Sequence, residues 1–192
     1  FWPGQRAQIA AHIAACEACK ADRTVLVRQN VLRPLPISKI FHRVHIDFMG
    51  PYKRTSDGNS YIVVAVDSWS RWVEAMATPN NKSLTAARFL YEHVICRHGV
   101  PKEIVSDRGS EWGGDFADLC DRYRIQRYRT AAYKPSTNGA VEIVNANIRA
   151  ALVKLIAEHG SLQCWDRLLP GVLFAYRCAP HSSTRFSPAY AL

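Results

Sequence analysis

The order in which strand-like and helix-like segments follow one another constrains the fold of this chain most. Val44, Ile46 and Phe48 alternate with polar residues, which is the period of two expected of a β-strand. Two further β-rich runs follow, each after a short turn cluster. The three predicted strands cover residues 44–48, 61–66 and 71–78. Because only short turns join them, they must form an antiparallel meander.

The rest of the chain predicts strand–helix–strand units. The expected segments are a helix between Ser83 and Gly99, a strand 102–106 that ends at Asp107, a helix 116–123, a strand 126–130, a long helix from Thr137 to about Glu158, and a helix 162–176 with a kink at Pro170. Ser83 is the expected N-cap of the first helix, and Gly99 followed by Pro101 is its stop. Such units require parallel strands joined by right-handed crossovers. The sequence therefore predicts an α/β fold, a mixed sheet with helices on both faces.

Three regions divide the chain. Residues 1–22 predict a short helical opening that contains Cys16 and Cys19, and residues 23–40 predict a basic linker around Pro34 and Pro36. Residues 41–192 form the main predicted domain. The first residues carry neither a starting Met nor a signal-peptide pattern, so we expect the chain to be cut from a longer polypeptide.

Composition narrows the classes of partner. Lys and Arg number 25 against 16 Asp and Glu, a net charge of +9, which favours nucleic acid as a partner and leaves a basic surface kept for solubility as the alternative. No run of eighteen apolar residues exists, so no membrane span is predicted. The six cysteines have scattered spacings, which predicts a reducing compartment. We expect four of them to be small buried hydrophobic residues: Cys96, Cys120, Cys164 and Cys178.

Three acidic residues stand where this topology could bring them together. Asp47 lies in the first strand, Asp107 ends the fourth strand, and Glu142 lies in the first turns of the long helix. Ligands of open α/β sheets bind at the carboxyl ends of strands. Three carboxylates suit a pair of Mg²⁺ ions, which can activate and stabilise the oxygens of phosphodiester transfer without a protein nucleophile. Each acid also has an ordinary structural reading, as a hydrogen-bonding strand residue, a turn cap or a residue favoured by the helix dipole.

The long helix carries two rows of residues. The apolar row is expected to be buried and consists of Val141, Val144, Ile148, Leu152 and Leu155. Glu142, Asn145 and Arg149 have the same spacing on another face. A carboxylate, an amide and a guanidinium in one row could coordinate metal and then follow a phosphate backbone.

Several segments of the chain resemble retroviral and gypsy-like retrotransposon integrases. These segments are Val44–Pro51, Val66–Trp72, Ser106–Trp112, Thr137–Glu142 and Phe186–Pro188. They occur in the order of that family and run through almost the whole chain, so the resemblance is specific. It implies a ribonuclease H-like fold with a mixed five-stranded sheet.

The resemblance also implies a function. An integrase is a polynucleotidyl transferase that trims the 3′ ends of an element's DNA and joins them to target DNA. Asp47, Asp107 and Glu142 would be the catalytic metal ligands, holding two Mg²⁺ or Mn²⁺ ions. The expected DNA contacts are Asn138 and Gly139 in the mobile loop before the helix, Asn145, Arg149 and Lys134. The expected setting is a homo-oligomer, a dimer or tetramer on DNA, in the nucleus.

The N-terminal region resembles the tail of the integrase zinc-binding domain. Cys16 and Cys19 match its Cys-x-x-Cys pair, and the two His ligands would lie upstream of Phe1. Structural zinc needs four ligands, so we expect Zn²⁺ only in the longer protein.

Some residues depart from the family pattern. Ile143 stands where a basic residue usually follows the glutamate, and Ser136 replaces a glutamine. These departures favour an alternative, a domesticated and catalytically inactive host protein that binds DNA or protein. A related nuclease, which typically carries a fourth acid near its site, is a third possibility. A basic strip of Arg122, Arg124, Arg127, Arg129 and Lys134, interleaved with tyrosines, fits either DNA contact or a solvated strand edge.

Overall fold

The computed structural model describes residues 39–129, 135–159, 163–181 and 184–192, and also Gln8, Ala11 and Ala15; the side chains at both ends of helix 135–159 are excepted. The chain divides into two units, Phe1–Leu35 and Pro36–Leu192, and the fold below belongs to the second. Cys16, Cys19 and most of the predicted linker lie outside the described residues, so the predicted boundaries at 22 and 40 stay predictions.

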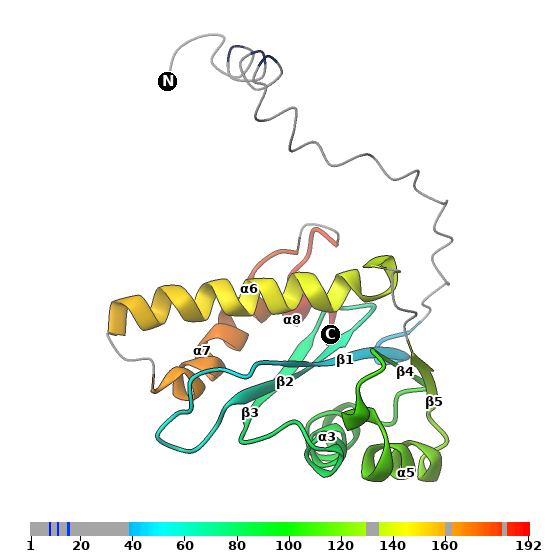
Figure 1. Cartoon of the computed structure of the whole chain (residues 1–192). Helices are drawn as coiled ribbons and strands as arrows, with labels where there is room; N and C mark the ends of the chain where they lie inside the picture. The colour runs from blue at the N-terminus through cyan, green and yellow to red at the C-terminus, as the bar shows by residue number, and fades with distance from the viewer. Residues whose placement is uncertain are drawn as a thin grey trace. The chain divides into compact units, whose positions relative to one another are not determined.

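A five-stranded mixed sheet forms the centre of the second unit (Figure 1). Its strands are β1 (Arg43–Met49), β2 (Tyr61–Asp67), β3 (Val73–Thr78), β4 (Glu103–Ser106) and β5 (Gln126–Arg129), in the order β3-β2-β1-β4-β5. The first three pair antiparallel, whereas β4 pairs parallel with both β1 and β5. Both the predicted meander and the predicted parallel units are confirmed.

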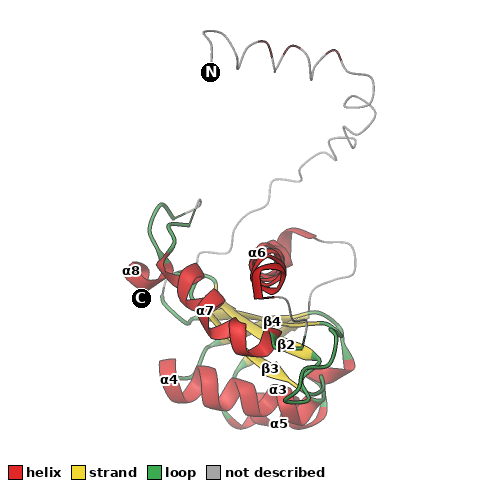
Figure 2. Ribbon diagram, turned by 90° about the vertical axis from the view of Figure 1, so that its left-hand side faces the viewer, coloured by secondary structure: helices red, strands yellow, loops and turns green. Residues whose placement is uncertain are grey.

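Helices lie on both faces of this sheet (Figure 2). The helical segments are α3 (Ser83–Phe89), η1 (Leu90–Ile95), α4 (Cys96–His98), η2 (Ser110–Trp112), α5 (Gly114–Arg122), α6 (Pro135–His159), α7 (Trp165–Cys178) and α8 (Pro188–Ala191). Helix α6 begins two residues before the predicted start, and α8 was not predicted. Pro170 lies inside α7, as expected. None of the helices described here has the length and apolar character needed to cross a bilayer.

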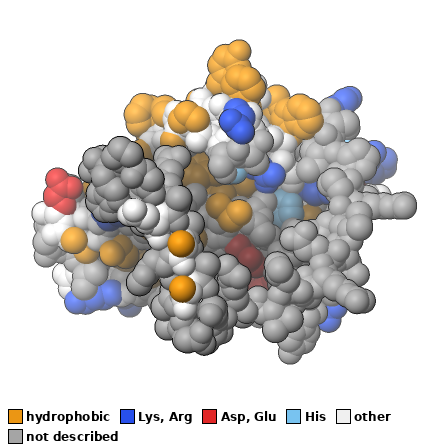
Figure 3. Space-filling model, turned by 90° about the horizontal axis from the view of Figure 1, so that it is seen from above, with side chains coloured by type: hydrophobic (Ala, Val, Ile, Leu, Met, Phe, Trp, Pro, Cys, Tyr) orange, Lys and Arg blue, Asp and Glu red, His pale blue; other side chains and the backbone are white. Residues whose placement is uncertain are grey.

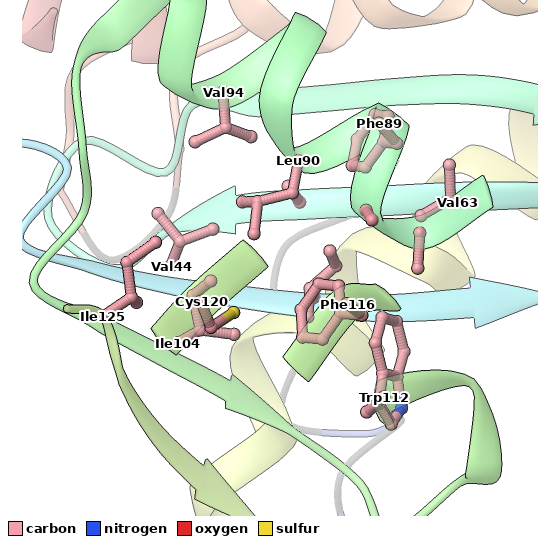
Figure 4. Close-up of a cluster of buried hydrophobic side chains, with 14 of the residues drawn as sticks. Val44, Val63, Phe89, Leu90, Val94, Ile104, Trp112, Phe116, Cys120 and Ile125 are labelled. Atoms are coloured by element: carbon pink, nitrogen blue, oxygen red, sulfur yellow. The ribbon is translucent and has the colours of Figure 1, made fainter. Parts of the chain in front are cut away.

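Strand alternation distributes the core between the two faces. Val44 and Ile46 of β1 pack on one face against α3, η1 and α5, where the cluster includes Phe89, Leu90 and Phe116 (Figure 4). Met49 of the same strand and Ile62 of β2 belong to the other face, under α6 and α7. Successive strand side chains point to opposite faces, so one strand supplies both cores. The predicted apolar row of α6, from Val141 to Leu155, packs in the second cluster as expected.

The start of α3 differs from the prediction. Its N-cap is Lys82, without a side-chain capping bond, and Ser83 is the first helical residue. The Ser83 hydroxyl donates instead to Asp115 Oδ2 on α5, at 2.8 Å. Asn80 Oδ1 accepts from the Lys82 N–H at 3.1 Å and from Thr85 Oγ1 at 2.7 Å, and so satisfies groups of the first turn from outside the helix. The predicted stop is confirmed, because Gly99 caps the helical segment with a positive φ of 90°.

The expectation of four buried cysteines is wrong for three of them. Only Cys120 is buried, and this burial raises the pKa of its thiol to about 12. Cys96 and Cys178 are exposed, and Cys164 is half-buried. These three lie at or beside helix ends, where spacing in the sequence says little about which face a side chain takes.

Candidate active site at the ends of β1 and β4

The pairing of β1 with β4 brings Asp47 and Asp107 into register. The two strands run parallel, with His45 opposite Val105. Continued by two residues, this register sets Asp47 opposite Asp107. Asp47 points to the face of the sheet that α6 covers, because it alternates with Val44 and Ile46 of the opposite face. Asp107 follows the end of β4 directly and is near enough for its charge to act on Asp47. The predicted convergence of these two acids is therefore supported by the register.

Asp47 is held from two sides. Its Oδ1 accepts a hydrogen bond from the Phe48 N–H at 2.8 Å, and its Oδ2 accepts one from Asn145 Nδ2 of α6, also at 2.8 Å. The pKa of Asp47 is raised from 3.8 to about 6. Burial raises it most and the negative charges of Asp107 and Glu111 also raise it, while the two hydrogen bonds lower it in part. A carboxylate in this setting is costly to ionise without a nearby cation.

Asp107 is held through one of its oxygens. Asp107 Oδ1 accepts from the Gly109 N–H at 3.0 Å and from the indole N–H of the buried Trp112. The Glu111 carboxylate lies directly against Gly109, in the position that a Cβ would occupy. A side chain at position 109 would displace the Glu111 carboxylate from its place beside the Asp107 turn.

Sequence reasoning missed Glu111 and Trp112. Both stand in the segment 106–112 that carries the family resemblance, so the available signal was their closeness to Asp107. What the spacing could not reveal is that Glu111 is near enough to Asp47 to affect its pKa.

Helix α6 corrects the predicted polar row. Glu142 and Arg149 are exposed as expected, but Asn145 is only 9% exposed and bonds Asp47. Asn145 follows Val141 by four residues and precedes Ile148 by three, so it lies on the buried stripe. Its Oδ1 is buried without a hydrogen-bond partner among the described residues.

Glu142 does not complete a ligand set in this structure. Among the described residues, no group of three His, Cys, Asp or Glu side chains could hold a metal ion. Glu142 lies three residues before Asn145, and residues that far apart on a helix are neighbours. It therefore lies about one turn away from the residue that contacts Asp47.

The other predicted site residues have different outcomes. Asn138 and Gly139 lie within α6, not in a loop before it as the resemblance implied. Their side chains, and all of Lys134, Cys16 and Cys19, lie outside the described residues. The DNA and zinc roles assigned to these residues stay predictions.

Two arginines of the basic strip, Arg127 and Arg129, lie on the exposed edge strand β5, whereas Arg122 ends α5 and Lys134 lies outside the described residues. Arg127 pairs with Ile104, whose side chain packs in the cluster on the α5 face, so Arg127 and Arg129 point to that face and away from the face of Asp47. Arg127 also donates to the Trp112 carbonyl oxygen at 3.4 Å and forms an ion pair with Asp121 at 3.5 Å. Part of the charge of the strip is thus used within the fold.

The residues at this site fit a divalent cation. Carboxylate oxygens are the ligands that Mg²⁺ prefers, and here two carboxylates lie close together, one of them bonded to the amide of Asn145. Acidic side chains are visible near the centre of the face seen from above (Figure 3). A cation between Asp47 and Asp107 would offset the burial and the repulsion that raise the pKa of Asp47.

Comparisons with known proteins agree with this geometry. A family model described as integrase core domain matches residues 38–135, just over half of the chain. The chain is 30% identical over 185 residues to a Caenorhabditis elegans protein described as uncharacterized, which covers 95% of this chain and 14% of that protein. It is 30% identical over 190 residues to the Pro-Pol polyprotein of simian foamy virus type 3, covering 98% of the chain and 16% of the polyprotein. With the Gag-Pol polyprotein of koala retrovirus, identity is 35% over 124 residues, covering 64% of the chain and 7% of the polyprotein. The chain thus spans less than a fifth of the length of these relatives.

Solved structures share the fold. An intasome of simian T-cell lymphotropic virus, in complex with the PP2A regulatory subunit B56 gamma, matches with a TM-score of 0.69 at 22% identity, covering 96% of this chain and 66% of that one. The catalytic core domain of HTLV-2 integrase, in complex with magnesium and in a trimeric form, matches with a TM-score of 0.62 at 19% identity, covering 78% of this chain and 95% of that one. The fold is therefore the ribonuclease H-like fold of integrase catalytic cores.

Proposed function

Because this chain belongs to the integrase core domain family, we propose that it is the catalytic core of an enzyme that trims the 3′ ends of an element's DNA and joins them to target DNA. The proposal rests on the pair of aspartates, Asp47 within β1 and Asp107 directly after β4, which lie near enough for the charge of Asp107 to help raise the pKa of Asp47.

Three acidic residues hold the metal in this proposal. Asp47 and Asp107 supply oxygens from the sheet, and Glu142 approaches from α6, about one turn from the residue that contacts Asp47. When bound, two Mg²⁺ or Mn²⁺ ions would activate the attacking oxygen and stabilise the leaving oxygen of the phosphodiester. Glu142 joins the aspartates when the cation offsets the repulsion among the carboxylates.

The surrounding residues orient these ligands. Asn145 fixes one oxygen of Asp47 through its amide N–H, and its own Oδ1 remains free for a water molecule or a ligand at the site. Arg149 lies one turn further along the exposed side of α6, where it would contact a phosphate. Asn138, Gly139 and Lys134 precede it in the chain and are the proposed contacts of the DNA end.

The assembly follows from the reaction. Two DNA ends must be joined to one target, so we expect at least a dimer on DNA, acting in the nucleus where chromosomal DNA lies. The solved relatives, an intasome and a trimeric core, support an oligomer. In the longer protein, Cys16 and Cys19 would contribute to a zinc site.

Asp107→Asn tests the catalytic assignment. The substitution keeps the size of the side chain and removes the charge, so it should abolish Mn²⁺-dependent joining of oligonucleotide ends while the melting temperature stays near that of the wild type. Asp115→Asn on α5, outside the proposed site, is the matched control and should retain joining. Joining by Asp107→Asn at the wild-type rate would show that the assignment is wrong.

A catalytically inactive, domesticated protein is the second candidate. It is favoured by Ile143, which stands beside Glu142, and by the incomplete ligand set among the described residues. Calorimetric titration with Mn²⁺ separates the two candidates, because an inactive protein would show no binding that depends on Asp47 and Asp107. A nuclease remains the third candidate, since Glu111 supplies a fourth acid near Asp47; strand-transfer products would rule out cleavage as the sole activity.

A further inference from the structure

We propose that Trp112 is a positioning residue for Asp107, whose indole N–H fixes one carboxylate oxygen inside the fold so that the other faces the metal site. This inference rests on the proposed function, because it assumes that Asp107 is a metal ligand. It concerns a side chain that is no ligand itself.

Two hydrogen bonds to the Asp107 side chain are accepted by the same carboxylate oxygen. The Gly109 N–H and the Trp112 indole N–H both donate to Oδ1, and no described residue donates to Oδ2. Two donors on the same oxygen restrict rotation of the carboxylate about its terminal bond. The second oxygen therefore has a defined direction and a free lone pair, which is what a metal ligand needs.

The indole ring is itself held in place. Trp112 is 1% exposed and packs against Phe116, with ring centroids 5.1 Å apart, and against Phe48 at 5.4 Å. Figure 4 shows Trp112 beside Phe116 at the margin of the hydrophobic cluster. Arg127 donates to its backbone carbonyl oxygen at 3.4 Å. The donor that reaches Asp107 is thus anchored in the core of the domain.

The same aromatic contact connects the two aspartates. Phe48, which touches the Trp112 ring, follows Asp47 directly and donates its N–H to Asp47 Oδ1. Trp112 therefore bonds one acid and packs against the residue that bonds the other. We infer that the ring helps to set the spacing of the pair.

The indole N–H of Trp112 contributes a hydrogen bond to Asp107, whereas the carbon atoms of the ring contribute the packing. A phenylalanine would fill much of the same apolar space but has no donor. A buried indole N–H needs an acceptor, and Asp107 is the one it has among the described residues. Removing the donor alone therefore isolates the positioning role.

Trp112→Phe and Trp165→Phe form a matched pair for the test. Trp165 is 3% exposed and also donates its indole N–H, to the Lys53 carbonyl oxygen at 2.8 Å, but it belongs to the other hydrophobic cluster. Calorimetric titration of the whole chain should show Mn²⁺ binding weakened roughly tenfold in Trp112→Phe, the size typical for loss of a residue that supports a metal ligand. Trp165→Phe should bind Mn²⁺ as the wild type does.

A second measurement reports the hydrogen bond without metal. The chain has five tryptophans, so a ¹H–¹⁵N spectrum of the wild type contains five indole signals. The Trp112 signal is assigned from through-space contacts to Phe116, which keeps the test valid if Trp112→Phe fails to fold. It should move when Asp107→Asn weakens the acceptor, while the Trp165 signal stays in place.

The outcomes separate the inference from the proposed function. If Asp107→Asn binds Mn²⁺ as tightly as the wild type, the proposed function fails, and the positioning role fails with it. If Asp107→Asn loses Mn²⁺ while Trp112→Phe binds it normally, only the inference is overturned. An indole signal of Trp112 that ignores Asp107→Asn overturns the inference as well.

Discussion

The side chain of Asp47 lowers the stability of the folded protein. Its carboxylate is partly buried and faces other acids, so its pKa in the folded protein is about 6 instead of 3.8. The folded state therefore binds more protons than the unfolded state between these two values. By linkage, stability falls as the pH rises through this window, and the full cost is present at neutral pH.

Asp47→Asn should stabilise the metal-free protein at pH 7.5. The amide removes a buried charge and can keep a hydrogen bond with Asn145, so we expect a gain of roughly 2–3 kcal/mol, from a shift of about two pKa units. The gain should shrink at pH 4.5, where Asp47 of the wild type is mostly protonated. Urea denaturation in the presence of a chelator measures both values.

The control for this prediction is an acid away from the site. Asp121→Asn removes a charge from the exposed part of α5 and should show no comparable gain at pH 7.5. If Asp47→Asn were less stable than the wild type at that pH, the electrostatic description of the site would be incorrect.

The sequence predicted the positions of some site residues correctly and those of others incorrectly. The family motifs identified Asp47 and Asp107, and the parallel pairing of β1 with β4 brings them near enough for the charge of Asp107 to raise the pKa of Asp47. Asn145 was predicted in a row with Glu142 and Arg149, on a different face of α6 from the apolar row. Spacing alone cannot show whether a polar residue at the margin of that apolar row is buried. Its hydrogen bond to Asp47 depends on how the helix sits on the sheet, which is a tertiary property.

Among the elements, β3 is tied to helices on both faces of the sheet by one buried acid. Glu74 accepts from the Trp72 indole at 3.0 Å and from Arg177 of α7 at 2.8 Å, and it contacts His98 of α4 at 2.9 Å. Burial acts to raise the pKa of Glu74, but the hydrogen bonds of Trp72 and His98 and the charges of Arg177 and Arg97 outweigh it and lower the pKa below 4.5. The stabilising contribution of Glu74 is therefore present at neutral pH and is lost as the pH falls through its folded pKa.

Glu74→Gln should destabilise the domain by about 3 kcal/mol at pH 7, because it leaves Arg177 without its counter-charge in a largely buried setting. Thermal or urea denaturation measures the loss. Asp57→Asn breaks an exposed pair with Arg167 and should change the melting temperature little. Equal losses in the two variants would contradict the role assigned to burial.

Helices and strands could be predicted where the pattern of apolar residues repeated over enough positions. Alternation identified β1 and β2 within one or two residues, and the apolar stripe identified α6. The π-helical turn η1 in the middle of the α3 to α4 segment was not predicted, since apolar spacing in the sequence does not distinguish it from an α-helix. The N-cap of α3 was misplaced because Ser83 has a better partner in Asp115, which is distant in sequence.

For the whole molecule, the order of the elements predicted the topology of the sheet. It did not predict whether Glu142 would join Asp47 and Asp107. Parallel pairing of β1, β4 and β5 was forced by the connections between them. How near Glu142 comes to the aspartates depends on the packing of α6 on the sheet, which the order of the elements does not determine. The arginines of β5 were predicted either to contact DNA or to form a solvated strand edge, and the register directs Arg127 and Arg129 to the face away from Asp47.

The most direct test of the account is a crystal structure of the protein soaked in Mn²⁺ at pH 7.5, with anomalous diffraction used to locate the ion. We expect an anomalous peak between Asp47 and Asp107, with Glu142 drawn toward it and Asn145 still bonded to Asp47. A peak elsewhere, or no peak at a Mn²⁺ concentration that supports DNA joining, would contradict it.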